Sequence, residues 1–242
     1  MAAGAYPLCM KPPAFISVVI PVHNGSRYLA AAIESVLAQT NPASQLIVVD
    51  DGSTDNSQQV AADYGDRVTR LSLPHRGPAA ARNAGVQQAR GNWLAFLDAD
   101  DLWLPERLAC QLPVAAADPT AAVTGGWENF LSPDVDPATG RTSLFAAGLQ
   151  TAPMAGTLLI EKKCFLDVGF FDESLRAGEF IDWVLRARQA GLQFTAVPEL
   201  ILRRRIHATN HTRQKSMRNR SFFDLIRKHH ESTASPAEGS TP

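Results

Sequence analysis

Three aspartates in the stretch GNWLAFLDADDLW are the residues whose types and spacing most directly predict chemistry. Asp98, Asp100 and Asp101 follow the apolar run WLAFL, which predicts a buried strand. Carboxylates this close raise each other's proton affinity unless positive charge lies between them. Mg²⁺ and Mn²⁺ prefer oxygen ligands and keep waters and substrate phosphates in their shell. The spacing therefore predicts a site for Mg²⁺ or Mn²⁺ that holds an anionic group such as a diphosphate.

A structural interpretation of the same aspartates stays open. Asp101 could cap a helix around the segment PERLACQL, with Asp98 and Asp100 solvated in the loop. That interpretation accounts for one aspartate and leaves the two beside it without a reason, so we favour the metal site.

A second acidic cluster, DDGSTD, follows the apolar run LIVV. Asp50 and Asp51 stand at the very end of this predicted strand, where one of them could accept a hydrogen bond from a base or a ribose. Gly52 permits a tight turn, and Ser53 or Asp55 can cap the helix that follows. From Gly52 onward we therefore favour a structural role.

The elements that must position these residues alternate between strand and helix over the first 125 residues. We expect strands at 16–20, 46–49, 67–73 and 93–97, and helices at 26–39, 56–64 and 78–89, the last opened by a proline. Beyond residue 131 the pattern is mixed, with a strand at 156–160, helices at 162–168 and 179–191, and short strands at 193–197 and 200–206.

Strands that alternate with helices predict a parallel sheet covered on both faces. In such sheets ligands bind just beyond the carboxyl ends of the strands. The segments PVHN, DDGSTD and DADD all emerge at that edge, so their placement predicts where the site lies.

Composition excludes several classes of protein. The 242 residues are 45% apolar and 19% charged, as in an ordinary globular α/β domain, and the net charge of −1 argues against a general nucleic-acid binder. The three cysteines lie far apart, without the spacing of a zinc site. No apolar run reaches the roughly 18 residues needed to cross a bilayer. We expect a cytoplasmic protein with a flexible leader at 1–15.

Four motifs in order resemble those of the family 2 glycosyltransferases: ISVVIPVHNGSRYLAAAIESVLAQ, IVVDDGSTDNS, GPAAARNAGVQQARGNWLAFLDADD and GTLLIEKKCFLDVGFFDESL. The resemblance implies a single α/β domain of the GT-A type, with a mostly parallel twisted sheet, helices on both faces and a mixed C-terminal half. It places a nucleotide-sugar-binding half at 16–131 and an acceptor-binding half at 132–211. It further implies a metal-dependent, inverting, hexosyltransferase-like enzyme that uses a nucleoside diphosphate sugar, a UDP-sugar being favoured, and an acceptor that the sequence does not identify.

The resemblance carries over to particular residues of this chain. It assigns donor binding to Pro21, His23, Asn24, Asp50, Asp51, Arg82, Asp98 and Arg205. It assigns metal binding to the DxD motif with its extra carboxylate and to one histidine, namely Asp98, Asp100, Asp101 and His207. Which of the three aspartates binds metal and which contacts the ribose stays open.

The histidine comes from the segment RRRIHATNHT, which resembles an Arg-x-His segment that folds back over the donor. Arg205, His207, Asn210 and His211 are its matching residues, with His207 the strongest. Alternating arginines in a strand are also typical of a solvated face, and that alternative stays open.

The general base is where the chain departs from the family pattern. The usual Glu-Asp pair falls at Glu179 and Phe180, so the aspartate is replaced. Asp182 lies three residues after Glu179, on the same face of a helix. Either acid could be the base, but Glu179 could instead stabilise a helix N-terminus, and Asp182 could pair with Arg186. The alternative function is a non-catalytic nucleotide- or partner-binding protein on a glycosyltransferase scaffold.

Two further segments have weaker signals. Trp127 and Glu128 fall where family members begin to line the acceptor site, although Trp127 could equally be a core residue. From residue 203 to residue 230 there are nine Lys or Arg residues and one acid. We expect residues 212–242 to form a basic amphipathic helix and a disordered tail. The helix could contact the inner face of a membrane or a partner, or pack on the domain.

Other nucleotide-using enzymes are disfavoured by the loop after the first strand. Nucleotidyltransferases and dinucleotide oxidoreductases need repeated glycines there, and PVHNGSRYL lacks them.

Overall fold

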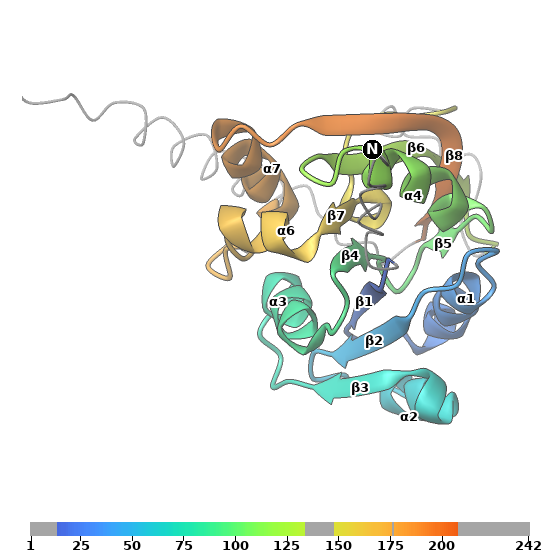
Figure 1. Ribbon diagram of the computed structural model, residues 1–242. Helices are drawn as coiled ribbons and strands as arrows, with labels where there is room; N and C mark the ends of the chain where they lie inside the picture. Colours follow the sequence, from blue (N-terminus) through green and yellow to red (C-terminus); the bar gives the residue numbers. More distant parts are fainter. Residues whose placement is uncertain (1–13, 134–147, 176, 208–242) are drawn as a thin grey trace, which may run out of the picture.

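One sheet of eight strands organises the protein in the computed structural model, which describes residues 14–133, 148–175 and 177–207. The strand order is β3-β2-β1-β4-β7-β6-β8-β5 (Figure 1). The strands span Ile16–Val22 (β1), Gln45–Asp50 (β2), Thr69–Ser72 (β3), Trp93–Phe96 (β4), Leu102–Trp103 (β5), Ala122–Leu131 (β6), Leu159–Glu161 (β7) and Phe194–Ile206 (β8).

The N-terminal half is the parallel sheet that the sequence predicts. β1 is buried along its whole length and pairs in parallel with β2 on one side and β4 on the other, and β3 continues the sheet beyond β2. Strands buried on both faces are near-continuous apolar runs, which is why β1, β2 and β4 were recognisable in the sequence.

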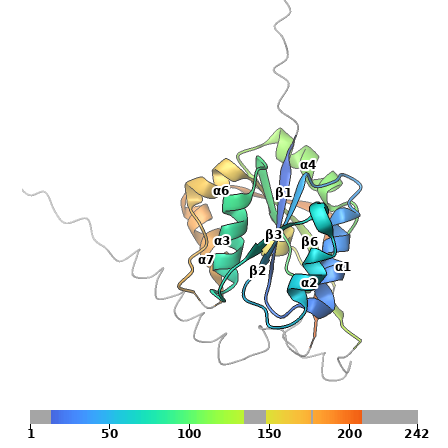
Figure 2. The same cartoon turned by 90° about the horizontal axis from the view of Figure 1, so that it is seen from below.

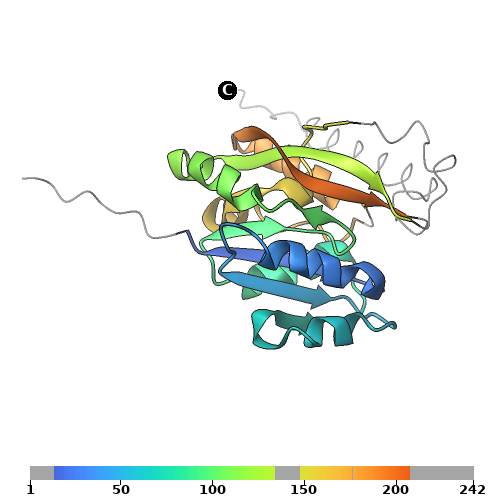
Figure 3. The same ribbon diagram turned by 90° about the vertical axis from the view of Figure 1, so that its right-hand side faces the viewer.

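The C-terminal half is mixed, and here one strand was missed and one prediction was wrong. β7 runs antiparallel to β4 and β6, while β8 runs parallel to β6, so that two long strands lie side by side (Figure 3). β6 was not predicted, because Gly125 and Gly126 weaken the strand pattern. The two short strands expected near the end are one strand, β8. Pro198 suggests a break, but it lies in an irregularity of the pairing, where Gly125 faces Val197 and Gly126 faces Leu200.

Helices cover both faces of the sheet, as predicted (Figure 2). α1, α2 and α4 pack against one face, and α3, α6 and α7 against the other. The spacing of Leu29, Ala32, Ile33 and Val36 explains how α1 buries one side against the sheet. The helices span Ser26–Leu37 (α1), Ser57–Ala62 (α2), Pro78–Gln88 (α3), Arg107–Ala117 (α4), Lys162–Val168 (α6) and Glu179–Gln189 (α7), with short 3₁₀ turns at Gly65–Arg67 (η1) and Ala155–Thr157 (η2).

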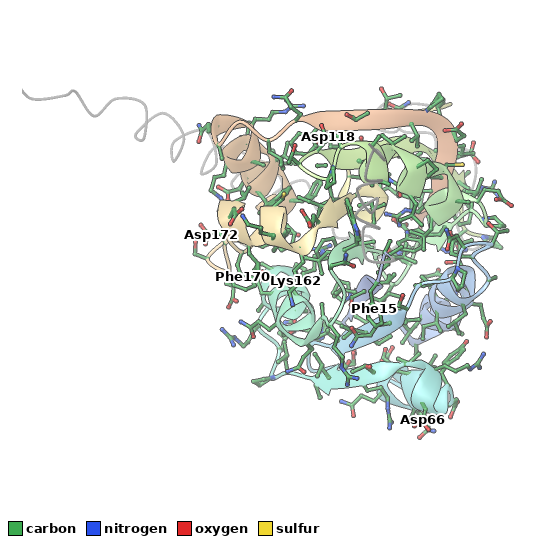
Figure 4. All side chains as sticks on the ribbon, in the orientation of Figure 1. Phe15, Asp66, Asp118, Lys162, Phe170 and Asp172 are labelled. Carbon is green, nitrogen blue, oxygen red and sulfur yellow. The ribbon has the colours of Figure 1, made fainter. Side chains whose placement is uncertain are left out.

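One lysine joins the two halves on the α3 side. Lys162, the first residue of α6, donates a hydrogen bond through Nζ to the carbonyl of Ala89 at the end of α3, at 2.6 Å (Figure 4). This hydrogen bond links α6, in the C-terminal half, to the end of α3. α3 is the helix that contains Arg82, a residue of the predicted site.

Within the part of the chain that the structure describes, no helix is long and apolar enough to cross a membrane. The predicted leader lies almost entirely outside the described residues. The whole of the basic segment expected at 212–242 also lies outside them.

Candidate active site

The three aspartates of the DADD segment lie in a tight turn at the carboxyl end of β4. The backbone N–H of Asp101 donates to the carbonyl of Asp98 at 3.1 Å. The two-residue strand β5 follows at once and pairs with β8, matching Leu102 with Arg203. This pairing brings the end of β8, which is distant in the sequence, to the aspartates.

A buried arginine lies between two acids of the site. Nη2 of Arg82, from α3, is 2.5 Å from Oδ1 of Asp98, and Nη1 is 2.5 Å from Oε1 of Glu179. Arg82 is 5% exposed. Burial would lower the pKa of this guanidinium, but Asp98 and Glu179 outweigh it and raise the pKa above its usual value. The arginine thus supplies positive charge beside the DADD turn and connects it to the start of α7.

Asp101 faces inward and anchors β8. Its side chain is buried, and Oδ1 accepts a hydrogen bond from the backbone N–H of Arg205 at 2.8 Å. Burial raises the pKa of this carboxyl well above its usual value, and the neighbouring charges of Asp100 and Asp98 raise it further. The helix-cap interpretation is wrong, because α4 begins at Arg107 without a side-chain cap.

The Arg-x-His segment meets the DADD turn, as the resemblance implied. Nε2 of His207 lies 2.9 Å from Oδ2 of Asp100, and Nε of Arg205 donates to the Asp100 carbonyl at 2.9 Å. Both interactions depend on the pairing of β8 with β5. Asn210 and His211 lie outside the described residues.

The donor set at this turn fits a hard divalent cation. Within the described ranges, no three side chains of His, Cys, Asp and Glu gather into a ready set of metal ligands. Mg²⁺, however, is usually held by one or two carboxylates, with substrate phosphates and waters filling its shell. Asp98 and Asp100 are partly exposed, with side chains 35% and 31% accessible, so each can offer an oxygen to such an ion.

The DDGSTD loop is held by Asn24, whose backbone adopts a left-handed conformation with φ of 51°. Its Oδ1 accepts hydrogen bonds from the backbone N–H groups of Thr54 at 2.8 Å and Asp55 at 3.3 Å. Asp50 is buried and accepts a hydrogen bond from Nε2 of Gln58 at 2.6 Å. These contacts give the loop the structural role that we favoured, and Asn24 and Asp50 take part in it. Pro21 lies inside β1 and is buried.

Asp51 accepts hydrogen bonds from a second loop, at residues 75–77, and from two histidines. Its carboxylate accepts hydrogen bonds from the backbone N–H groups of Arg76 at 2.6 Å and Gly77 at 2.7 Å. Its carbonyl accepts from Nδ1 of His23 at 2.8 Å and of His75 at 3.1 Å. The two imidazole rings lie 4.0 Å apart. His75 was not predicted. The sequence signal that could have identified His75 is its position just before α3, at the same edge of the sheet.

Asp55 should make the DDGSTD loop sensitive to acid. Burial would raise the pKa of Asp55, but hydrogen bonds from Ser57 and Ser26 outweigh it and lower the pKa from 3.8 to about 2. The stabilisation is therefore present above pH 3.8 and lost as the pH falls toward 2. Because Asp55 is exposed, we expect Asp55→Asn to cost only about 1 kcal/mol at neutral pH. Urea titrations of both proteins should show this difference shrinking below pH 4; a difference independent of pH would contradict it.

At the start of α7 the two candidate bases lie in different surroundings. Glu179 is 8% exposed and pairs with Arg82. Phe180 packs into the apolar cluster, with its ring 6.4 Å from that of Trp183. The Asp182 side chain is fully buried and pairs with Nε of Arg186 at 2.8 Å, the i+4 pairing that the sequence left open as an alternative.

The two acceptor candidates lie on β6. Nε1 of Trp127 donates to the carbonyl of Ala152 at 2.9 Å, and the tryptophan is only partly buried. Oε1 of Glu128 accepts from Nε of Arg203 at 2.9 Å. The acceptor role of both residues stays a prediction.

The comparisons with known proteins agree with this architecture. The structure resembles that of S. aureus TarS residues 1–349, with a TM-score of 0.68 and 18% identity over 88% of this chain and 63% of the TarS chain. Solved TarS structures include complexes with UDP and with UDP-GlcNAc. This similarity shows a GT-A-like fold, as predicted.

The profile of glycosyl transferase family 2 matches residues 17–176. An uncharacterised glycosyltransferase of Rickettsia prowazekii is 30% identical over 87% of this chain and 70% of its own length. Haloferax volcanii glycosyltransferase AglE is 30% identical over 77% of this chain and 66% of its own length. A Rickettsia felis relative is covered over only 36% of its length. The chain belongs to glycosyl transferase family 2, which confirms the predicted family and its enzyme class.

Proposed function

We propose that this protein transfers a sugar from a nucleoside diphosphate donor, a UDP-sugar, to an acceptor hydroxyl with inversion at the anomeric carbon. The transfer depends on Mg²⁺ or Mn²⁺. The observation that carries the proposal is the pairing of the buried Arg82 with Asp98 and Glu179, beside the Asp100–His207 pair. This arrangement puts acids and bases of separate elements at one edge of the sheet, where open α/β sheets bind ligands.

The polar residues of the DADD turn and its surroundings have two kinds of role. Some bind the metal or the sugar donor, and others hold the structure in place. Asp98 and Asp100 are the partly exposed carboxylates of the turn, so we assign the metal to them. When bound, the cation supplies charge stabilisation of the departing diphosphate. Arg205 and His207 border the same turn and can donate hydrogen bonds to phosphate oxygens. Asp101 anchors β8 through the backbone of Arg205.

Glu179 is the residue to which we assign the general base. A general base must reach the acceptor hydroxyl and take its proton as the hydroxyl oxygen attacks the anomeric carbon. Arg82 binds Oε1 of Glu179 and fixes the carboxylate beside Asp98. Asp182 is a poorer choice, because its side chain is completely buried and faces Arg186.

The non-catalytic alternative rests on Phe180. The family aspartate is replaced by a phenylalanine whose ring lies in the apolar cluster. Such a protein would bind a nucleoside diphosphate and leave the sugar bond intact. Donor binding and donor turnover, measured on the same preparation, separate the two functions.

UDP binding should depend on both metal and Asp100. At about 100 times its dissociation constant, a ligand stabilises the folded state by roughly 2.7 kcal/mol. We therefore expect UDP with MnCl₂ to raise the melting temperature of the wild type by several degrees, and not to raise that of Asp100→Ala. Differential scanning fluorimetry with Mn²⁺, with Mg²⁺ and with a chelator measures the effect.

The matched control is Asp66→Ala, which removes an exposed aspartate in η1 at the opposite end of the strands (Figure 4). This variant should respond to UDP as the wild type does. If UDP, GDP, dTDP and CDP all fail to stabilise the wild type with either metal, the proposed donor site is wrong.

A further inference from the structure

Arg205 is clamped between two aromatic rings from different elements. Its guanidinium carbon lies 4.7 Å from the ring centre of Tyr28 in α1 and 4.5 Å from that of Phe130 in β6. Arginines within about 6 Å of an aromatic ring are attracted by its negative face. Tyr28 and Phe130 are 102 positions apart in the sequence (130 − 28), so the fold itself builds this clamp.

The clamp completes a set of contacts that fix Arg205 at the DADD turn. The backbone N–H of Arg205 donates to Asp101, and its Nε donates to the carbonyl of Asp100. The ring of Tyr28 also lies 4.9 Å from that of His207, and its hydroxyl is 3.2 Å from Oγ of Ser132. Tyr28 therefore contacts both members of the Arg-x-His pair.

Two more arginines lie near the same two rings. The guanidinium of Arg27 lies 5.2 Å from the ring of Tyr28, and that of Arg203 lies 5.1 Å from the ring of Phe130. Arg205 is the arginine that lies near both rings, and it also hydrogen-bonds to the DADD turn.

We propose that Tyr28 and Phe130 are positioning residues, which hold the guanidinium of Arg205 in the orientation that binds the diphosphate of the donor. An arginine side chain loses considerable rotamer freedom when it binds a ligand, and fixing it beforehand removes that cost from binding. A planar guanidinium binds phosphate oxygens through paired hydrogen bonds, so its orientation matters more than its charge alone. The inference rests on the proposed function, because it takes the ligand of Arg205 to be a nucleoside diphosphate.

The test compares UDP affinities with MnCl₂, measured by isothermal titration calorimetry. Tyr28→Leu removes the ring and should weaken UDP binding about tenfold, because the Arg205 side chain must then be ordered when UDP binds. Tyr28→Phe keeps the ring and should stay within about twofold of the wild type. Tyr64→Leu is the matched control, since Arg67 lies 5.1 Å from the Tyr64 ring beyond α2, away from the DADD turn. It should bind UDP like the wild type.

A double-mutant cycle shows whether Tyr28 acts through Arg205. Arg205→Met should weaken UDP binding, and adding Tyr28→Leu to it should weaken binding by no more than about twofold further, because the clamp then has no guanidinium to hold. Should Tyr28→Leu fail to fold, Phe130→Leu replaces it in the same cycle, with the same expectation.

The outcomes separate this inference from the proposed function. If the wild type binds no UDP, the proposed donor is wrong and the inference falls with it. If the wild type binds UDP and Tyr28→Leu binds equally well, or if its effect is additive with that of Arg205→Met, the donor site stands and the clamp has no positioning role.

Discussion

Replacing Glu179 with glutamine should lower turnover by a factor of about 10² to 10⁴ while leaving donor binding nearly unchanged, because a general base contributes about that much to the rate. Glutamine is similar in size and its amide oxygen can still accept a hydrogen bond from Arg82, whose Nη1 lies 2.5 Å from Oε1 of Glu179. The amide cannot take a proton from the acceptor. The loss should therefore fall on turnover. UDP release from a panel of UDP-sugars measures turnover, and calorimetry with UDP measures binding.

The control for Glu179→Gln is Glu173→Gln, which also replaces an arginine-paired glutamate. Glu173 pairs with Arg76 at 2.6 Å in a half-exposed bridge, and its other oxygen accepts a hydrogen bond from Nδ2 of Asn83 at 3.0 Å. Its activity should stay close to that of the wild type. If Glu179→Gln retains activity within about threefold, Glu179 is not the base. If the wild type binds UDP and releases none from any UDP-sugar of the panel, the non-catalytic alternative gains support.

The parts of the fold that the sequence predicted are those that depend on local patterns. β1, β2 and β4 are continuous apolar runs, and α1 shows its buried face at a helical spacing. Because these strands are parallel, their carboxyl ends had to meet at one edge. The position of the aspartates after β4, at that edge of the sheet, could therefore be predicted from the sequence.

The parts that could not be predicted depend on long-range pairing. Asp101 turns inward because β5 pairs with β8, which brings the Arg205 backbone to its carboxylate. Nothing near Asp101 in the sequence indicates this contact. The aromatic clamp around Arg205 has the same origin, since Tyr28 and Phe130 belong to α1 and β6. The pattern of residue types indicated Asp98, Asp100 and Asp101 as candidates, but which of them is buried depends on the pairing of β5 with β8.

Loss of the Arg82 side chain should strongly lower the stability of the protein. Its guanidinium pairs with Asp98 and Glu179 and is almost completely buried. Arg82→Met keeps the apolar stem but leaves two carboxylates without their counter-charge, and Glu179 is itself 8% exposed. Removing one partner of a buried ion pair costs about 3–5 kcal/mol. We expect a loss of about 3 kcal/mol, at the lower end because Asp98 is partly exposed, together with loss of activity.

Urea unfolding at neutral pH measures this cost against a matched arginine. Arg76→Met breaks the more exposed bridge to Glu173 and should cost less than about 1 kcal/mol. Adding Glu179→Gln to Arg82→Met removes one of the unpaired charges, so the double variant should be more stable than Arg82→Met alone. If Arg82→Met and Arg76→Met lower the free energy of unfolding equally, Arg82 does not stabilise the fold through its pairs with Asp98 and Glu179. A double variant less stable than the single one would show that the cost of Arg82→Met comes from packing rather than from unpaired charge.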